Sequence, residues 1–336
     1  MNQFKKLNNY IGWSIFLIAS FVYLSTIEQT VSFWDCGEYI ATAYKLEVGH
    51  PPGAPFFQLF GRIFTLFASQ GTSEVAVAIN ILSALCSSFA ILFLFWTITA
   101  FGRKLFLNDD KEIELGRIIA VLGSGVVGAL AYTFSDSFWF SAVEGEVYAM
   151  SSLFTAVTFW CIMKWEEESD KPHASRWLVL IGYLIGLSIG VHLLSLLTIP
   201  AMGMIYYFKK NKYTKVGAIK AFVVSMVMLG LVQGVIIPGA VSLISKFELF
   251  FVNTIGLPFN SGTIIYFLAI IGAITYGLIY TKKHNKAVWN TAILGVMMLL
   301  IGYSSFAIVV IRSNANPPID ENNPEDAVSL LTYINR

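Results

Sequence analysis

The sequence is poor in charge and in cysteine, and both shortages exclude classes of protein. Asp, Glu, Lys and Arg make up only 13% of the 336 residues, whereas soluble domains carry about 25%. The net charge is +1 and there is no basic arm, so nothing in the sequence points to nucleic acid. Two of the three cysteines, Cys86 and Cys161, lie inside apolar runs, which argues against a disulfide framework.

Several motifs that would name a chemistry are also missing. The sequence has no P-loop, no Rossmann glycine pattern, no Cys/His metal spacing and no serine-hydrolase elbow. No cofactor is therefore indicated. A divalent metal would suit a group of carboxylates, but the spacing of the acids here does not specify one.

What the sequence has instead is a series of apolar runs, each close to 20 residues long. Such runs predict an all-α polytopic membrane protein. The first run follows Lys5 and Lys6 and lacks a small-residue cleavage site, so we interpret it as a retained span and not as a signal peptide. About nine spans are expected, at 10–27, 74–101, 117–134, 147–164, 177–192, 193–208, 216–245, 263–280 and 287–311.

The distribution of lysine and arginine predicts the sidedness of these spans. One further run, Ala54–Ala68, is short and contains Arg62. If this run stays at the interface, 17 of the 22 basic residues are cytoplasmic and 5 are outside; if it spans, the bias is reversed. The positive-inside rule favours the first arrangement. The N terminus is then cytoplasmic, and residues 28–73 form an extracytoplasmic loop.

The segment Trp34–Glu47 of this loop contains no proline and is expected to form a surface helix. Pro51, Pro52 and Pro55 are expected to end that helix and to start the next one. Asp35, Glu38, Thr42 and Lys45 follow steps of three, four and three residues, so they are expected to share one helical face. A carboxylate there could act as the base that activates an acceptor hydroxyl. The same pattern also fits a solvated face, with Asp35 as an N-terminal helix charge.

Two further outer segments carry polar residues. "GHPPG" holds His50 in a rigid turn, which is either a functional feature or a helix-breaking loop. "SDSFWFSAVEGEVYAM" sets Asp136, Glu144 and Glu146 among aromatic residues. Aromatic residues at an interface usually serve as anchors, but acids among them are unexpected.

Two cations on the outer side are candidates for binding a phosphate. His192 lies at the turn between two short spans, and Arg312 follows the last span. Arg312 could meet a lipid phosphate through two parallel hydrogen bonds. An ordinary structural histidine and an interface-anchoring arginine remain the alternatives.

Taken together, the outer motifs resemble those of a known enzyme architecture. A first span, a long outer loop with an early Asp, a surface helix and an HPP turn resemble the GT-C membrane glycosyltransferases, in particular their protein O-mannosyltransferase branch. "WDCGEYIATAYKLEVGHPPGAPFF", "FWFSAVEGEVYAM" and "IRSNANPPIDENNP" are also similar to a domain-of-unknown-function family common in Bacteroidota and related to a vertebrate transmembrane O-mannosyltransferase. The likeness covers nearly the whole chain.

The resemblance implies a GT-C-type helical bundle and an inverting glycosyltransferase. Such an enzyme moves mannose or another hexose from a polyprenyl-phosphate donor to Ser/Thr of an extracytoplasmic protein. Asp35 matches the family's loop base, and His50 matches the turn histidine. Glu38 is implied as the second catalytic acid of the family's pattern. It lies three residues beyond Asp35, whereas in the better-known relatives the two acids are adjacent.

The remaining assignments follow from charge and sidedness. Lys45, His192 and Arg312 are expected to contact the donor phosphate, together with His50. Glu144, Glu146 and Asp136 are expected to contact the acceptor or to support the site. The expected location is the inner membrane of a bacterium, with membrane lipids around the helices and the active site on the periplasmic face.

Other functions stay open at this point. A GT-C enzyme that glycosylates a lipid or a polysaccharide would share the donor class. A transporter or flippase would show repeated halves and polar residues at midspan, and a scaffold would leave the outer acids unexplained. Residues 1–311 are expected to form the membrane domain. Relatives of the family continue into a soluble region, so residues 312–336 are expected to begin one.

Overall fold

The computed structural model describes residues 2–69, 71–107 and 114–336. Within these ranges the chain is helical, and the only strand-like pairing is an isolated bridge between Val48 and Asp320. Seven helices are long and apolar enough to cross a membrane. The predicted all-α polytopic membrane protein is therefore confirmed. The predicted spans 177–192 and 193–208 correspond to shorter helical segments.

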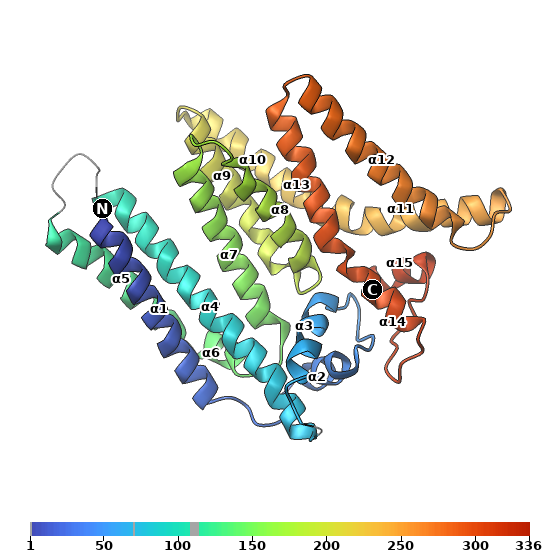
Figure 1. Ribbon diagram of the computed structural model, residues 1–336, viewed down its shortest axis with the longest axis horizontal. Helices are drawn as coiled ribbons and strands as arrows, with labels where there is room; N and C mark the ends of the chain where they lie inside the picture. Colours follow the sequence, from blue (N-terminus) through green and yellow to red (C-terminus); the bar gives the residue numbers. More distant parts are fainter. Residues whose placement is uncertain (1, 70, 108–113) are drawn as a thin grey trace. The chain divides into compact units, whose positions relative to one another are not determined.

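The first seven helices precede residue 169 (Figure 1). They are α1 (Asn2–Ser25), α2 (Cys36–Lys45), α3 (Pro55–Thr65), α4 (Thr72–Phe106), α5 (Leu115–Thr133), α6 (Asp136–Ala142) and α7 (Val147–Glu168).

The later elements include 3-10 and π-helical segments, which carry the label η. They are α8 (Ser175–Ile189), η1 (Leu193–Thr198), α9 (Ile199–Lys210), α10 (Lys215–Leu231), η2 (Val232–Ile236), α11 (Ile237–Leu249), η3 (Phe250–Thr254), α12 (Ser261–Lys283), α13 (Ala287–Tyr303), η4 (Ser304–Phe306), α14 (Ala307–Ser313) and α15 (Ala327–Ile334).

The chain folds into two compact units. The first unit comprises Met1–Tyr44 and Phe57–Met163, and the second comprises Lys45–Phe56 and Lys164–Arg336. Most of the first outer loop thus belongs to the first unit, while its central turn belongs to the second.

In the first unit, α1 and α5 both pack antiparallel to α4. Trp13 meets Trp96 with ring centroids 6.2 Å apart, and Phe16 meets Phe89 at 4.5 Å. The side chain of Val121 lies beside Gly102. Because the helices alternate in direction, the start of α1, the end of α4 and the start of α5 lie at one end of the unit (Figure 1).

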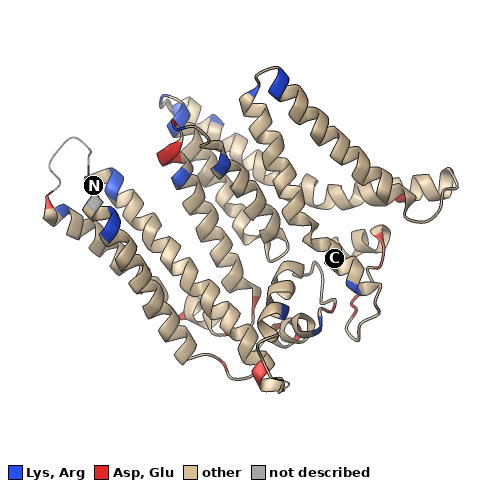
Figure 2. Ribbon diagram, in the orientation of Figure 1, with Lys and Arg blue, Asp and Glu red and all other residues tan. Residues whose placement is uncertain are grey.

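Charge separates along the helices of the first unit. Lys5, Lys6, Arg103, Lys104 and Arg117 lie at the end just described, with Glu114 beside Arg117. Figure 2 shows basic residues gathered at this end. The acids of the two outer loops lie where α1 ends and α7 begins. This separation agrees with the predicted sidedness, which stays a prediction because no membrane is present. Lys111, predicted to be cytoplasmic, lies outside the described residues.

The short run Ala54–Ala68 does not cross from one end to the other. It forms α3, a helix of 11 residues that begins at Pro55, as the proline pattern predicted. The open face of Gly61 on α3 receives the Ala43 side chain of α2. Since α1 and α4 are antiparallel, the end of α1 and the start of α4 lie at the same end of the unit. This arrangement agrees with the interpretation of the run as a segment that does not span.

In the second unit, α8 and α13 run parallel and make the closest backbone approach. A Cβ on Gly182 would lie 2.5 Å from the carbonyl oxygen of Gly295, and one on Gly302 would lie 2.5 Å from the amide nitrogen of Leu187. The small residues let two backbones meet, as is typical of helix pairs in membranes. The predicted span 216–245 is interrupted by η2, just before Pro238, which lacks a backbone N–H.

Helix α12 shows most clearly how the second unit suits a membrane. Ile264, Phe267, Leu268 and Ile271 are exposed, and α12 has no charged residue before Lys282. Its start is capped by Glu248, whose carboxylate accepts hydrogen bonds from the backbone N–H groups of Asn260 and Thr263 at 2.6 and 2.8 Å. An exposed apolar helix with satisfied ends is stable in hydrocarbon.

The predicted sidedness can be tested with single cysteines at the two ends of α12. All three native cysteines are buried, so they should contribute little background labelling. A membrane-impermeant maleimide added to intact cells should label Phe259→Cys. It should label Lys283→Cys only after permeabilisation. Labelling of Lys283→Cys from outside would reverse the assigned orientation.

The contact between α8 and α13 predicts an asymmetric pair of alanine variants. Gly182→Ala would press a Cβ against a backbone oxygen, so it should destabilise the protein by about 1–3 kcal/mol. Gly295→Ala, on the facing helix, has nothing within 4 Å of its Cβ and should not destabilise. Thermal unfolding in detergent compares the two. Equal losses would contradict the close approach.

Candidate active site

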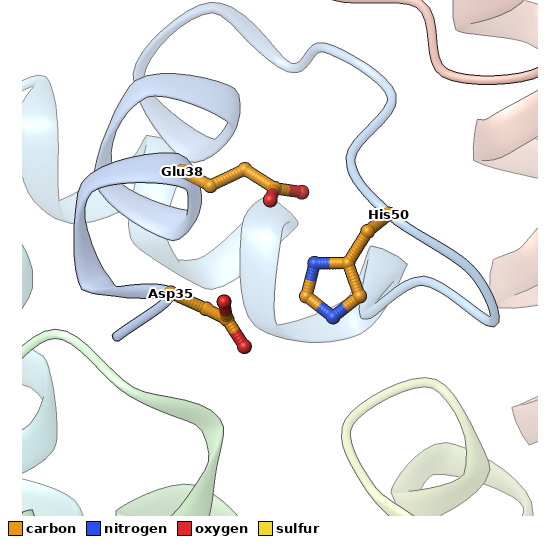
Figure 3. Close-up of side chains that lie close together, drawn as sticks. All are labelled: Asp35, Glu38 and His50. Carbon is orange, nitrogen blue, oxygen red and sulfur yellow. The ribbon is translucent and has the colours of Figure 1, made fainter.

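The first outer loop presents two carboxylates at the start of α2. Asp35 is exposed and immediately precedes the helix, where its carbonyl accepts a hydrogen bond from the Tyr39 N–H at 2.9 Å. Glu38 lies half-buried in the first turn. Carboxylate oxygens of Asp35 and Glu38 lie within 4.8 Å of each other (Figure 3). The free N–H groups of a helix start favour acids at this place.

The second outer loop contributes two carboxylates that are buried. Glu144 and Glu146 are each only 4% exposed and lie between α6 and α7. The Glu146 carboxylate accepts a hydrogen bond from the backbone N–H of Val147 at 3.1 Å, at the start of α7. Glu144 is hydrogen-bonded to Ser32 and Cys36 of the first outer loop, while its Oε2 atom has no hydrogen-bond partner. The two outer loops are thus joined.

Burial favours the protonated forms of Glu144 and Cys36, which lie where the two outer loops meet. It raises the pKa of Glu144, and the nearby Glu28 acts in the same direction, while the bonds from Ser32 and Cys36 oppose them. Burial also raises the pKa of the Cys36 thiol, and the carboxylates of Glu144 and Glu146 add to the effect. Cys36 therefore stays a thiol and is not a nucleophile.

Tyr39 links the acids of both loops and was not anticipated from the sequence. Burial raises the pKa of its hydroxyl, and the charges of Glu146, Asp35 and Glu38 raise it further. All three carboxylates therefore lie close enough to act on one phenol. The Tyr39 ring packs edge-on against Phe57, with centroids 5.6 Å apart. The structure thus gathers acids that lie more than 100 residues apart in sequence.

Asn80, in the first half of α4, fixes the entry to the first outer loop. Its side-chain amide donates hydrogen bonds to the carbonyl oxygens of Glu28 at 2.7 Å and Thr30 at 3.2 Å. Gly145 of the second loop packs directly on it, since a Cβ there would lie 3.0 Å from Asn80 Oδ1. An asparagine inside an apolar span is a signal that the sequence analysis could have used.

Thr42 and Asp136, two of the other predicted residues, differ in their exposure to solvent. Thr42 is buried rather than presented with Asp35 and Glu38. Its hydroxyl donates to the Glu38 carbonyl at 2.8 Å and accepts from Gln58 Nε2 at 3.0 Å, so the expected shared face ends where α3 packs. Asp136 is exposed in the first turn of α6.

The remaining predicted residues belong to the second unit. Arg312 on α14 donates hydrogen bonds to the carbonyl oxygens of Leu46 at 2.5 Å and Lys45 at 3.2 Å. The side chain of Lys45 is exposed. His50, labelled in Figure 3, is half-buried in the turn, and its carbonyl accepts a hydrogen bond from the Gly53 N–H at 2.9 Å.

His192 caps the helical segment η1. Its Nδ1 atom accepts a hydrogen bond from the Leu194 N–H at 3.2 Å. Burial lowers the pKa of His192, which agrees with a neutral ring. With Nδ1 as the acceptor, the proton of a neutral ring lies on Nε2, which makes Nε2 a hydrogen-bond donor.

The segment that contains most of the predicted site matches a known protein family. Residues 35–217, more than half of the chain, match the family described as "Protein O-mannosyl-transferase TMEM260 N-terminal domain". The chain belongs to this family. The match begins at Asp35 and contains every predicted site residue except Arg312. The predicted O-mannosyltransferase-like membership is therefore confirmed.

Two curated relatives carry the corresponding protein name. The protein O-mannosyl-transferase tmem260 of Dictyostelium discoideum is 28% identical over 196 residues, which are 55% of this chain and 22% of that protein. The protein O-mannosyl-transferase TMEM260 of Mus musculus is 25% identical over 177 residues, 52% of this chain and 22% of that protein. The chain thus matches about a fifth of each relative. No solved structure matches this chain.

The buried Glu144 predicts a pH dependence of stability. Because its pKa is raised from 4.5 in the folded state, the unfolded chain releases the proton first. The wild type should therefore lose stability as the pH rises above 4.5 through the folded pKa. Glu144→Gln mimics the protonated acid and should lack this trend.

The measurement is thermal unfolding from pH 4 to pH 9. The exposed control Glu114→Gln should follow the wild type across the series. A wild type that stays more stable than Glu144→Gln at pH 9 would contradict a raised pKa.

Proposed function

We propose that this chain is an inverting glycosyltransferase that moves a hexose, mannose in the first instance, from a polyprenyl phosphate to Ser/Thr of extracytoplasmic proteins. Membership in the TMEM260 N-terminal domain family and the names of the relatives support the reaction class. The observation that carries the proposal is the carboxylate pair of Asp35 and Glu38, which lies at the start of α2 where the family match begins.

In the proposed reaction, Asp35 is the general base. The acceptor hydroxyl gives its proton to the Asp35 carboxylate while its oxygen attacks the anomeric carbon of the sugar. The bond between that carbon and the phosphate oxygen breaks, and its electron pair leaves with the polyprenyl phosphate. Attack from the face opposite the phosphate inverts the anomeric centre. Asp35 is exposed, so an acceptor can reach it.

Glu38 and the second outer loop support this base in the proposal. Glu38 is the neighbouring carboxylate, within 4.8 Å of Asp35, and is assigned a supporting role in the site. The charges of Glu146, Asp35 and Glu38 all raise the pKa of Tyr39, and Glu144 joins the two loops through Ser32 and Cys36. Asp136 is exposed and is assigned to the acceptor side.

The donor phosphate is assigned to residues of the second unit. Lys45 and Arg312 supply positive charge, and His50 and His192 supply imidazole donors. Because Arg312 already binds two backbone carbonyls through Nε and one Nη, its other Nη group is the part assigned to the phosphate. The exposed apolar helices offer a surface for the polyprenyl tail.

Alternative functions are less well supported. A transporter needs polar residues along its path through the membrane. The acids of α4, α7 and α11 instead lie in the terminal turns, and α1, α5, α10, α12 and α13 contain none. A lipid or polysaccharide acceptor would use the same base and donor, so only the acceptor in an assay separates it from a protein acceptor. The inner membrane of a bacterium, with the site on the periplasmic face, is the proposed location.

The base assignment predicts the effect of one isosteric substitution. Asp35→Asn should lower the transfer rate about 10²- to 10⁴-fold while donor binding persists, because an amide cannot take the proton. The measurement is transfer by purified protein from a panel of polyprenyl-phosphate sugars to Ser/Thr peptides.

The matched control is Asp170→Asn, an exposed aspartate paired with Lys209. It should transfer at the wild-type rate. Full activity in Asp35→Asn would remove Asp35 as the base. A wild type that transfers no sugar from the whole panel would overturn the proposed function.

A further inference from the structure

The turn that carries His50 is held by the last helix of the chain. We call residues 49–53 the HPP turn. The Tyr333 hydroxyl on α15 lies 2.7 Å from the Gly49 carbonyl oxygen and 3.3 Å from that of His50. A hydroxyl has one proton, so Gly49 receives the stronger bond and His50 the weaker. Two successive carbonyls of the HPP turn thus point at one donor.

Tyr333 also fits the turn by shape. Its side chain is almost fully buried, with 1% exposed. Gly53 has φ +81°, and a Cβ added there would lie 2.6 Å from the Tyr333 hydroxyl oxygen. Glycine is thus required both by the left-handed backbone and by the phenol packed against it.

The flanks of the HPP turn are fixed within the same unit. Before the turn, the Val48 N–H donates to the Ile319 carbonyl at 3.0 Å, and the Glu321 N–H donates to the Val48 carbonyl at 3.0 Å. After the turn, the Phe56 N–H donates to the Gly190 carbonyl at 2.8 Å. With both flanks anchored, the Tyr333 hydroxyl is a side-chain donor to the backbone between them.

Helix α15 is itself well placed to hold Tyr333. Asp326 caps it by accepting hydrogen bonds from the N–H groups of Val328 and Ser329, both at 2.8 Å. In turn, the Ser329 hydroxyl accepts a hydrogen bond from the Asp326 N–H at 3.0 Å. Such a reciprocal cap fixes the start of a helix. Tyr333 follows one turn after Ser329, next to which Leu330 is buried.

We infer that Tyr333 is a positioning residue for the donor phosphate, which acts by fixing the backbone of the HPP turn and thereby the direction of the His50 imidazole. The inference rests on the proposed function, because that function assigns His50 to the phosphate. It adds a residue outside the family match, which ends at residue 217. Tyr333 itself touches only protein in this role.

The test measures binding of undecaprenyl phosphate to purified protein in detergent, by titration calorimetry. All variants carry Asp35→Asn, so that binding is read without turnover. Tyr333→Phe keeps the ring and removes the hydroxyl. It should raise the dissociation constant about three- to tenfold, the range that one lost hydrogen bond supports.

A double variant separates positioning from general stability. If Tyr333 acts through His50, then Tyr333→Phe should add nothing to the effect of His50→Gln. The control Tyr303→Phe removes another buried hydroxyl, which donates to the Ile237 carbonyl at 3.0 Å, and should leave binding unchanged. Additive effects, or wild-type binding by Tyr333→Phe, would overturn the inference.

Alanine variants of Gly53 and Gly256 test the position of the HPP turn independently of the Tyr333 hydroxyl. Gly53→Ala should raise the dissociation constant because its Cβ displaces the phenol. Gly256→Ala has the same φ of +81° but nothing within 4 Å of its Cβ, so it should bind as the parent does. Equal behaviour of the two variants would count against the inference.

The proposed function is judged separately, by sugar transfer with Asp35 intact. Transfer by the wild type, combined with unchanged binding in Tyr333→Phe, would overturn the inference alone. Loss of binding in Tyr333→Phe without transfer by the wild type would overturn the function and keep the phosphate site. If the parent protein does not bind undecaprenyl phosphate, the inference is wrong whatever the transfer assay gives.

Discussion

The rest of this structure depends on the inability of hydrocarbon to solvate charge. That constraint empties the spans of acids and sends lysine, arginine, aspartate and glutamate to the helix ends. In the first unit most cations lie where α4 ends, and the acids of the outer loops lie where α7 begins. Charged chemistry can then occur only at the helix ends, and the loops there become the place to build it.

Loops at a surface are mobile unless buried polar contacts hold them, and here those contacts are few and specific. Asn80 secures the backbone at Glu28 and Thr30, while Glu144 reaches Ser32 and Cys36. In a weakly polar interior such bonds are strong when satisfied and costly when broken. Burial keeps a proton on Glu144 at a higher pH than usual, and a protonated carboxyl can donate as well as accept. These contacts thereby tie the second outer loop to the first.

Features that depend on hydropathy, charge and proline position could be predicted from the sequence. Features that depend on which other segment a side chain contacts could not. The helical spans, the surface helix near Trp34–Glu47 and the start of α3 at Pro55 follow from apolar run length and proline position. The burial of Thr42 against Gln58 and the backbone partners of Arg312 do not, because spacing along one helix carries no information about which other segment covers it. Tyr39 was passed over for the same reason: its significance lies in Glu146, more than 100 residues away.

The contact between Tyr333 and the HPP turn has a consequence for the order in which the protein is made. Tyr333 follows Gly49 by 284 residues, and pairing across such a distance must wait for the intervening chain. During synthesis, the turn therefore emerges 284 residues before the tyrosine that supplies its hydroxyl partner. Val48 waits almost as long for Ile319 and Glu321. The segment that carries His50 can therefore complete its contacts only after a long stretch of later chain has been synthesised.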